Sequence, residues 1–199
     1  MRYCSEVALS AKASEPEKLV VCALDAGAKG EPARQKDCLT QLTAACPDDA
    51  RAQTLMGAFH FGRQDYDAAI AAYEKATTLD PSFSQPYNQM GYAYRFLGRN
   101  QEAEKFFRQA LETSPEYTQA RVNLGLILAG QERFREAERE LARAVAEAPS
   151  DPRGLTALGM VRTRLGRVAE GVEAFRGVAA LDPKSPEARL NLGIALADQ

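Results

Sequence analysis

Apolar and small residues along this 199-residue chain fall into columns that repeat every 34 residues. A large apolar residue followed directly by glycine recurs at 56–57, 90–91, 124–125, 158–159 and 192–193. A second set of columns holds a small residue at 69, 103, 137 and 171 and a large apolar residue four positions later, at Tyr73, Phe107, Leu141 and Phe175. Since an α-helix turns about 100° per residue, each set lies on one side of a helix. The pattern therefore predicts two helices per repeat, with small residues that let the backbones approach and large residues that fill the space beside them.

Proline marks where each pair of helices ends. Prolines at 47, 81, 115, 149 and 183 keep the 34-residue spacing, and proline favours the end of one helix pair and the start of the next. Gly98 and Gly166 are expected in the turn between the two helices of a pair. A period of this length indicates stacked repeats. We predict repeats at 50–83, 84–117, 118–151 and 152–185, followed at 186–199 by the first helix of a truncated repeat or a C-terminal cap.

The repeat at 84–117 resembles the tetratricopeptide repeat (TPR). The residues that fill the signature columns of that family are Tyr87, Met90, Gly91, Tyr94, Gly98, Ala103, Phe107, Ala110 and Pro115. The resemblance covers residues 50–183 as four full repeats. It implies an all-α fold, a right-handed superhelical solenoid of antiparallel helix hairpins.

The first quarter of the chain follows the columns less closely. Residues 16–49 are expected to form a divergent, cysteine-containing TPR-like hairpin, and residues 1–15 a helix of a preceding unit or an N-terminal cap. All four cysteines lie here: Cys4, Cys22, Cys38 and Cys46. Cys22 faces the second helix of its hairpin and Cys38 lies at the edge of that helix's inward face. A Cys22–Cys38 disulfide is therefore one hypothesis, and buried free thiols are the other.

The charge of the chain argues against several classes of partner. Twenty-five basic and twenty-seven acidic residues give a formal charge of −2, so nucleic acid and anionic membrane surfaces are not expected to attract the chain. No apolar run is long enough for a signal peptide or a membrane span. We therefore expect a soluble cytoplasmic protein, or a periplasmic or secreted one if an export signal has been removed.

The TPR resemblance also implies a binding surface. TPR proteins hold an extended peptide or a partner helix on the concave surface that their first helices form, and we expect a protein or peptide partner here. The residues at the corresponding positions are Arg51, Thr54, Ala58, Phe61, Gln85, Asn88, Tyr92, Arg95, Phe96, Gln119, Val122, Asn123, Leu126, Arg153, Thr156, Met160 and Arg164.

The strongest contacts are expected where Phe61, Tyr92 and Phe96 cluster with Arg51 and Arg95, because aromatic residues and arginine supply most binding hot spots. Packing of Phe61 and Phe96 against the neighbouring hairpin is the alternative. Some TPR grooves clamp the carboxylate-ended tails of chaperones with lysine and asparagine. Thr54 and Ala58 occupy those positions here, so that ligand is not expected.

Catalysis is not expected from this chain. His60, the single histidine, is predicted to pack inside its hairpin, and no nucleophile motif, phosphate-binding loop, metal-ligand spacing or cofactor site accompanies it. One alternative is that the chain is the substrate-recruiting arm of a larger enzyme, such as a glycosyltransferase. Another is a helical-repeat reader of single-stranded RNA, which the 34-residue step and near-neutral charge disfavour.

The last predicted helix presents Leu192 and Leu196 to a second helix that the sequence does not contain. Either the chain is a fragment of a longer protein, which we favour, or another copy or a partner covers this apolar strip.

Overall fold

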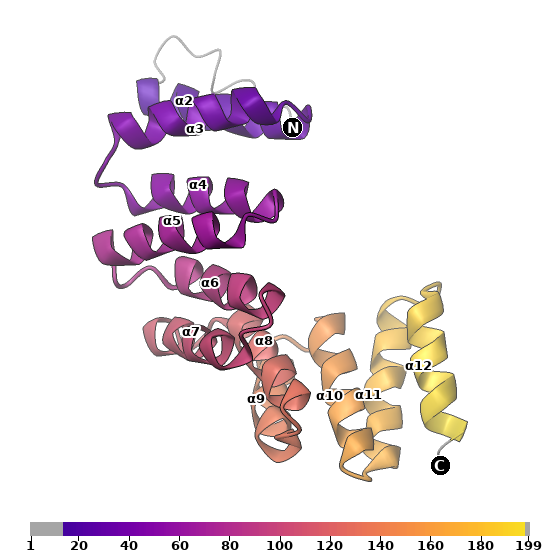
Figure 1. Cartoon of the computed structure of the whole chain (residues 1–199). Coiled ribbons are helices and arrows are strands. Elements are labelled where there is room, and N and C mark those ends of the chain that lie inside the picture. Colours follow the sequence, from indigo (N-terminus) through magenta and orange to yellow (C-terminus); the bar gives the residue numbers. More distant parts are fainter. Residues whose placement is uncertain (1–13, 198–199) are drawn as a thin grey trace. The chain divides into compact units, whose positions relative to one another are not determined.

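The computed structural model describes residues 14–197, and within that range it consists of helices joined by short turns (Figure 1). The helix or cap predicted at residues 1–15 lies almost entirely outside the described part, and so does Cys4. The residues divide into two compact units between Arg99 and Asn100. Unit 1 contains α2 (Glu15–Ala28), α3 (Pro32–Ala45), α4 (Ala50–Gly62), α5 (Tyr66–Leu79) and α6 (Ser84–Phe96). Unit 2 contains α7 (Asn100–Thr113), α8 (Thr118–Gly130), α9 (Phe134–Glu147), α10 (Pro152–Arg164), α11 (Val168–Leu181) and α12 (Pro186–Ala197).

Helix starts repeat with the sequence period. α4, α6, α8, α10 and α12 begin at 50, 84, 118, 152 and 186, the residues that open the predicted repeats. Each proline of the 34-residue column is the second residue of a four-residue turn. In the turn that contains Pro81, the Phe83 N–H donates to the Asp80 carbonyl at 3.2 Å. Consecutive helices pack in pairs, α2 with α3 and α4 with α5 in unit 1, and α8 with α9 and α10 with α11 in unit 2. The all-α helical-repeat fold is thereby confirmed.

The turn within each hairpin depends on one residue in the left-handed region. Gly30, Gly98 and Gly166 occupy this column, and Gln64 and Glu132 occupy it in the other two hairpins, with φ values from 62° to 77°. The next N–H then reaches back five residues to a carbonyl at the helix end, as from Arg99 to Tyr94 at 2.9 Å. This is the Schellman closure of a helix C-terminus. Gly98 and Gly166 lie in the turns where glycine was expected.

The hairpin core is built on close contact between a glycine of the first helix and a large side chain of the second. The ring of Tyr73 lies directly against Gly57, Leu141 against Gly125, and Phe175 against Gly159. Tyr73 and Leu141 are fully buried. Small and large columns therefore pack as the sequence predicts, and the large residue of the second helix takes the space that a Cβ would need.

The N-terminal hairpin joins the same core. Ala23 of α2 and Leu39 of α3 pack with Phe59 of α4, and α3 begins 34 residues before α5. The Cys22 and Cys38 side chains lie together in this cluster. The divergent hairpin is thus in register with the repeats that follow it.

Unit 2 differs from one expectation. Leu192 does not face an absent helix: it packs on α11 beside Val172 and Phe175, because that side of α12 is the one that meets α11. The exposed apolar residues of α12 are Leu190, Ile194 and Leu196. None of the helices in the described range is long and apolar enough to span a membrane.

Candidate functional site

The aromatic residues expected on the first helices of unit 1 form a cluster with a ring from a second helix. The centroid of Phe61, near the end of α4, lies 5.6 Å from that of Phe96 at the end of α6, with the rings edge to face. Tyr66, the first residue of α5, stacks on Phe96 with 5.4 Å between centroids and 8° between planes. Phe61 also meets Tyr66 edge to face at 5.4 Å. We call these three residues the aromatic cluster.

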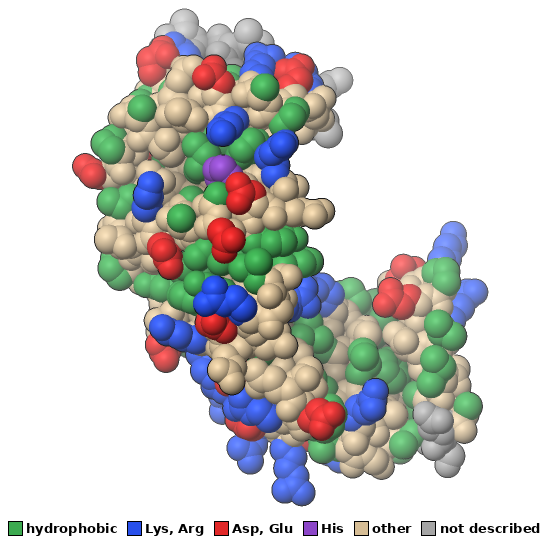
Figure 2. Space-filling view, in the orientation of Figure 1, with side chains coloured by type: hydrophobic (Ala, Val, Ile, Leu, Met, Phe, Trp, Pro, Cys, Tyr) green, Lys and Arg blue, Asp and Glu red, His purple; other side chains and the backbone are tan. Residues whose placement is uncertain are grey.

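The rings of the aromatic cluster pack against one another and remain partly exposed to solvent. Phe96 keeps 54% of its surface exposed, and Phe61 and Tyr66 are partly buried. Phe61 and Phe96 therefore pack between neighbouring hairpins, as the packing alternative predicts, and still leave an open face; their contact with a ligand stays a prediction. Figure 2 shows hydrophobic side chains gathered over this part of unit 1. Ring–ring packing fixes the side-chain rotamers before any ligand arrives.

Arg95 provides the charge at this surface. Its guanidinium carbon lies 5.3 Å from the ring centroid of Phe96 and 5.6 Å from that of Tyr92. Both distances are within the range of a cation–π contact. Arg95 is exposed, and no carboxylate of residues 14–197 forms an ion pair with it. Arg95 therefore combines a fixed position with an available charge.

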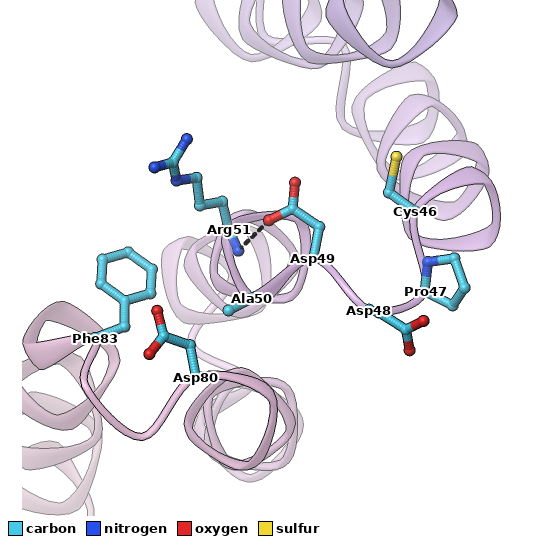
Figure 3. Close-up of a pocket in the computed structure, with 8 residues that line it drawn as sticks. All are labelled: Cys46, Pro47, Asp48, Asp49, Ala50, Arg51, Asp80 and Phe83. Atoms are coloured by element: carbon cyan, nitrogen blue, oxygen red, sulfur yellow. Dashed lines mark hydrogen bonds between the residues drawn. The ribbon is translucent and has the colours of Figure 1, made fainter.

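Arg51 does not belong to this cluster, contrary to expectation. It lies near the start of α4, and ten residues at about 1.5 Å each separate it from Phe61 by roughly 15 Å along the helix. Arg51 lines a separate pocket of about 560 Å³ with the residues labelled in Figure 3, Cys46, Pro47, Asp48, Asp49, Ala50, Asp80 and Phe83. Asp49 there accepts a hydrogen bond of 2.8 Å from the Arg51 backbone N–H and caps α4.

An apolar cavity of about 490 Å³ lies between the N-terminal hairpin and α4. Leu24, Leu39, Leu55, Ala58 and Phe59 contribute most of its apolar wall. The remaining lining residues are Ala23, Gly30, Pro32, Gln35, Gly62 and Arg63. Ala58 is the only one of the residues expected in the groove that lines it. The guanidinium carbon of Arg63 lies 5.9 Å from the Phe59 ring centroid.

Four of the expected groove residues are buried, and the structure corrects their assignment as surface contacts. They are Thr54, Asn88, Val122 and Asn123. First helices contact one another, α4 with α6 and α8 with α10, so the side expected to be free is partly covered. The Thr54 hydroxyl donates to the Ala50 carbonyl at 2.7 Å, and the Asn123 side-chain oxygen accepts from Arg153 at 3.1 Å.

Four residues of unit 2 that were expected in the binding groove line one cavity. Leu126 of α8 and Arg153, Thr156 and Met160 of α10 line a space of about 400 Å³, and α11 and α12 close its other side. The remaining lining residues are Pro152, Ala157, Val178, Asp182, Ser185, Glu187, Ala188 and Asn191. Met160 is 55% exposed. Gln85, Gln119 and Arg164 are exposed on their helices but do not line the three cavities described above.

Sequence reasoning missed two residues of the unit 1 surface. Tyr66 opens a second helix and Arg63 lies in the turn before it, whereas only first-helix positions were expected to contribute. Both positions follow the C-terminal end of α4, so a search of the hairpin corner beside Phe61 would have found them.

His60 packs within its hairpin. Its Nδ1 atom lies 3.3 Å from Asp65 Oδ2, its ring meets Phe59 edge to face, and most of its side chain is covered. Within residues 14–197 no group of three or more histidine, cysteine or acidic side chains is arranged to hold a metal ion.

The structure pairs Cys22 with Cys38 across α2 and α3, with 6.0 Å between their Cα atoms, a separation typical of disulfides. Cys46 remains a thiol. Oxidation of the pair in the protein stays a prediction.

Comparison with known proteins identifies the repeats. Three tetratricopeptide repeat models match, over residues 48–116, 96–161 and 156–199. No curated protein sequence matches the chain. Among solved structures, PilW, described as a widely conserved type IV pilus biogenesis factor, is similar with a TM-score of 0.79 and 19% identity over 92% of this chain and 86% of PilW.

Two further structures share the fold. MamA from Desulfovibrio magneticus RS-1 has a TM-score of 0.73 at 18% identity, covering 88% of this chain and 99% of its own. YrrB, described as a TPR protein with an unusual peptide-binding site, has a TM-score of 0.69 at 26% identity, covering 80% of this chain and 82% of its own. Repeat models that together extend from residue 48 to residue 199, and the helical repeat itself, establish that the chain belongs to the tetratricopeptide repeat family.

Proposed function

We propose that this chain is a protein-interaction scaffold that binds a peptide segment of a partner protein, with the aromatic cluster and Arg95 of unit 1 as the main contact. The observation that carries the proposal is the exposed face of a pre-packed cluster, Phe61, Tyr66 and Phe96, beside an arginine without an ionic partner in the described chain. A soluble domain rarely leaves such a surface open unless something binds it.

The energetics of the cluster favour binding. A ligand that covers Phe96 removes apolar surface from water, worth about 25 cal/mol per Å² before the costs of association. The rotamers of Phe61 and Tyr66 are already fixed by ring contacts, so little side-chain entropy is lost on binding. The peptide-binding site named for YrrB, a relative at 26% identity, supports the same class of ligand. The cavity lined by Leu126 and Met160 in unit 2 is proposed as a second contact.

A selection from a display library of short random peptides tests the proposal. We expect peptides that the wild-type chain retains and that the double variant Phe61→Ala/Phe96→Ala loses. Leu79→Ala is the matched control, because it also removes an exposed apolar side chain from unit 1 but lies on the second helix α5. Circular dichroism checks that each variant keeps its helices. Equal retention by the wild type and the double variant would refute this surface as the binding site.

A further inference from the structure

Acidic residues are absent from four first helices of this chain. α4, α6, α8 and α10 contain no aspartate or glutamate, and arginine is their only side chain with a full charge at neutral pH. Yet the whole chain has more acidic than basic residues. The acidic residues of the repeats are placed on the second helices and in the turns, as with Glu74 on α5 and Glu138 on α9. Within the four repeats at 50–185, charge is therefore segregated by helix type, although the net charge of the chain is close to zero.

In unit 2, arginines that form ion pairs account for part of the excess of positive charge on the first helices. Arg121 is largely buried and binds Glu140 and Glu147, at 3.1 and 3.4 Å. Arg162 of α10 lies 3.3 Å from Glu138. These arginines join first helices to second helices, and their charge is already balanced. They are not available to a ligand.

Two arginines of unit 1, Arg63 and Arg95, form no ion pair within residues 14–197. The guanidinium group of Arg95 lies near the rings of Phe96 and Tyr92, and that of Arg63 lies near the ring of Phe59. The acidic residue nearest to Phe61 along the chain is Asp65. Its carboxylate accepts a hydrogen bond from the Ala68 N–H at 3.4 Å and lies 3.3 Å from His60.

The same pairing of an apolar surface with an arginine occurs twice in unit 1. Arg63 is the single charged residue lining the cavity between the N-terminal hairpin and α4, where Leu24 is 47% exposed. Arg95 lies over the ring of Phe96 in the aromatic cluster. A guanidinium held against a ring keeps its outer N–H groups free for a carboxylate, which it can bind with two parallel hydrogen bonds.

We propose that the ligand of unit 1 is an acidic peptide in which large apolar side chains are flanked by aspartate or glutamate. The inference rests on the proposed function and specifies the chemistry of its partner. The apolar side chains enter the cavity at Leu24 and cover Phe96, while the carboxylates bind Arg63 and Arg95. The site differs from a clamp for a terminal carboxylate, because the cations are arginines in and beside the hairpin corners and require no chain end.

The composition of the peptides selected from the random library is the first test. Among the selected peptides that the variant Phe61→Ala/Phe96→Ala loses, we expect enrichment of aspartate, glutamate and large apolar residues, and depletion of lysine and arginine. Enriched peptides without an acidic excess would overturn this inference and leave the proposed function standing. Failure to enrich any peptide would overturn both.

The second test measures the affinity of one selected peptide by fluorescence anisotropy, beside a version in which asparagine and glutamine replace its acidic residues. Arg95→Gln should weaken binding of the acidic peptide by about threefold to tenfold and leave the amide version nearly unchanged. Arg34→Gln removes the same charge from the second helix α3, where Arg34 pairs with Glu31, and should change affinity by less than about twofold. Added salt should reduce the difference in affinity between the acidic peptide and its amide version. Equal effects of the two substitutions, or equal binding of the two peptides, would refute a role for Arg95 in reading acidic residues.

Discussion

Replacing Gly57 by alanine tests the close contact between a glycine and a large side chain that occurs in three hairpins of this chain. A Cβ at Gly57 would lie 2.6 Å from Cδ1 and 2.9 Å from Cζ of Tyr73, whereas carbon atoms in contact prefer about 3.5–4.0 Å. The ring must move by about 1 Å, and Tyr73 is fully buried, so neighbouring side chains must move with it. Such overpacking costs about 1–3 kcal/mol, partly offset by about 1 kcal/mol because alanine favours helix more than glycine does. We expect a net loss of up to about 2 kcal/mol.

Gly62→Ala is the matched control, because Gly62 ends the same helix and an added Cβ would meet nothing within 4 Å. It should leave stability unchanged or raise it by up to about 1 kcal/mol. Urea unfolding followed by circular dichroism measures the difference, and hydrogen exchange of α4 and α5 assigns it to this hairpin, since repeat proteins do not always unfold as one unit. If Gly57→Ala were as stable as Gly62→Ala, the close approach of Tyr73 to the backbone of α4 would be wrong.

Three further predictions follow from single features of unit 1. Tyr73→Phe should be neutral or stabilising by about 1 kcal/mol, because the buried hydroxyl has no hydrogen-bond partner in the described structure. Burial also raises the pKa of the Tyr73 hydroxyl above its ordinary value of 10.0, so this residue favours folding below pH 10 and loses that contribution as pH rises further. In urea unfolding, alkaline pH should therefore destabilise Tyr73→Phe less than the wild type. Gln64→Gly should raise the thermal midpoint by the equivalent of about 1 kcal/mol, because φ at 64 is positive, whereas Gln64→Ala keeps the strain and should give no such gain. Reduction of the Cys22–Cys38 pair should destabilise unit 1 by about 3 kcal/mol on loop-closure grounds, and mass mapping of non-reduced peptides that found both thiols free would contradict the pairing.

The sequence was sufficient for the helices because the columns that define them are also the columns that pack. Gly57 and Tyr73 belong to different helices, but both repeat every 34 residues, so their contact could be inferred from spacing alone. Pro81 repeats with the same step and predicts a helix boundary, since a residue without an N–H cannot continue the hydrogen bonding of the preceding helix.

The surface was less predictable because it depends on residues that do not repeat. Glu140 of α9 binds Arg121 of α8, a contact between two helices that helix spacing does not predict. Asn88 occupies a column expected to be exposed, and contact between neighbouring first helices accompanies its burial. Tyr66 joins the aromatic cluster from outside the first-helix columns altogether. Such contacts follow from three-dimensional neighbours, which periodicity does not specify.

The two units expose different kinds of side chain at the positions of the repeat that do not pack in the hairpin core. Unit 1 presents the exposed ring of Phe96 beside an arginine without an ionic partner in the described chain, whereas the cavity of unit 2 places Met160 near the acidic residues Asp182 and Glu187. Because the packing columns fix the hairpins in both units, the remaining positions can diverge without loss of core contacts. A ligand of unit 1 therefore need not be a ligand of unit 2. Peptides selected by the wild-type chain should fall into two groups, one weakened by Arg95→Gln and one weakened by Met160→Ala. A single group that responds to both substitutions would refute independent recognition.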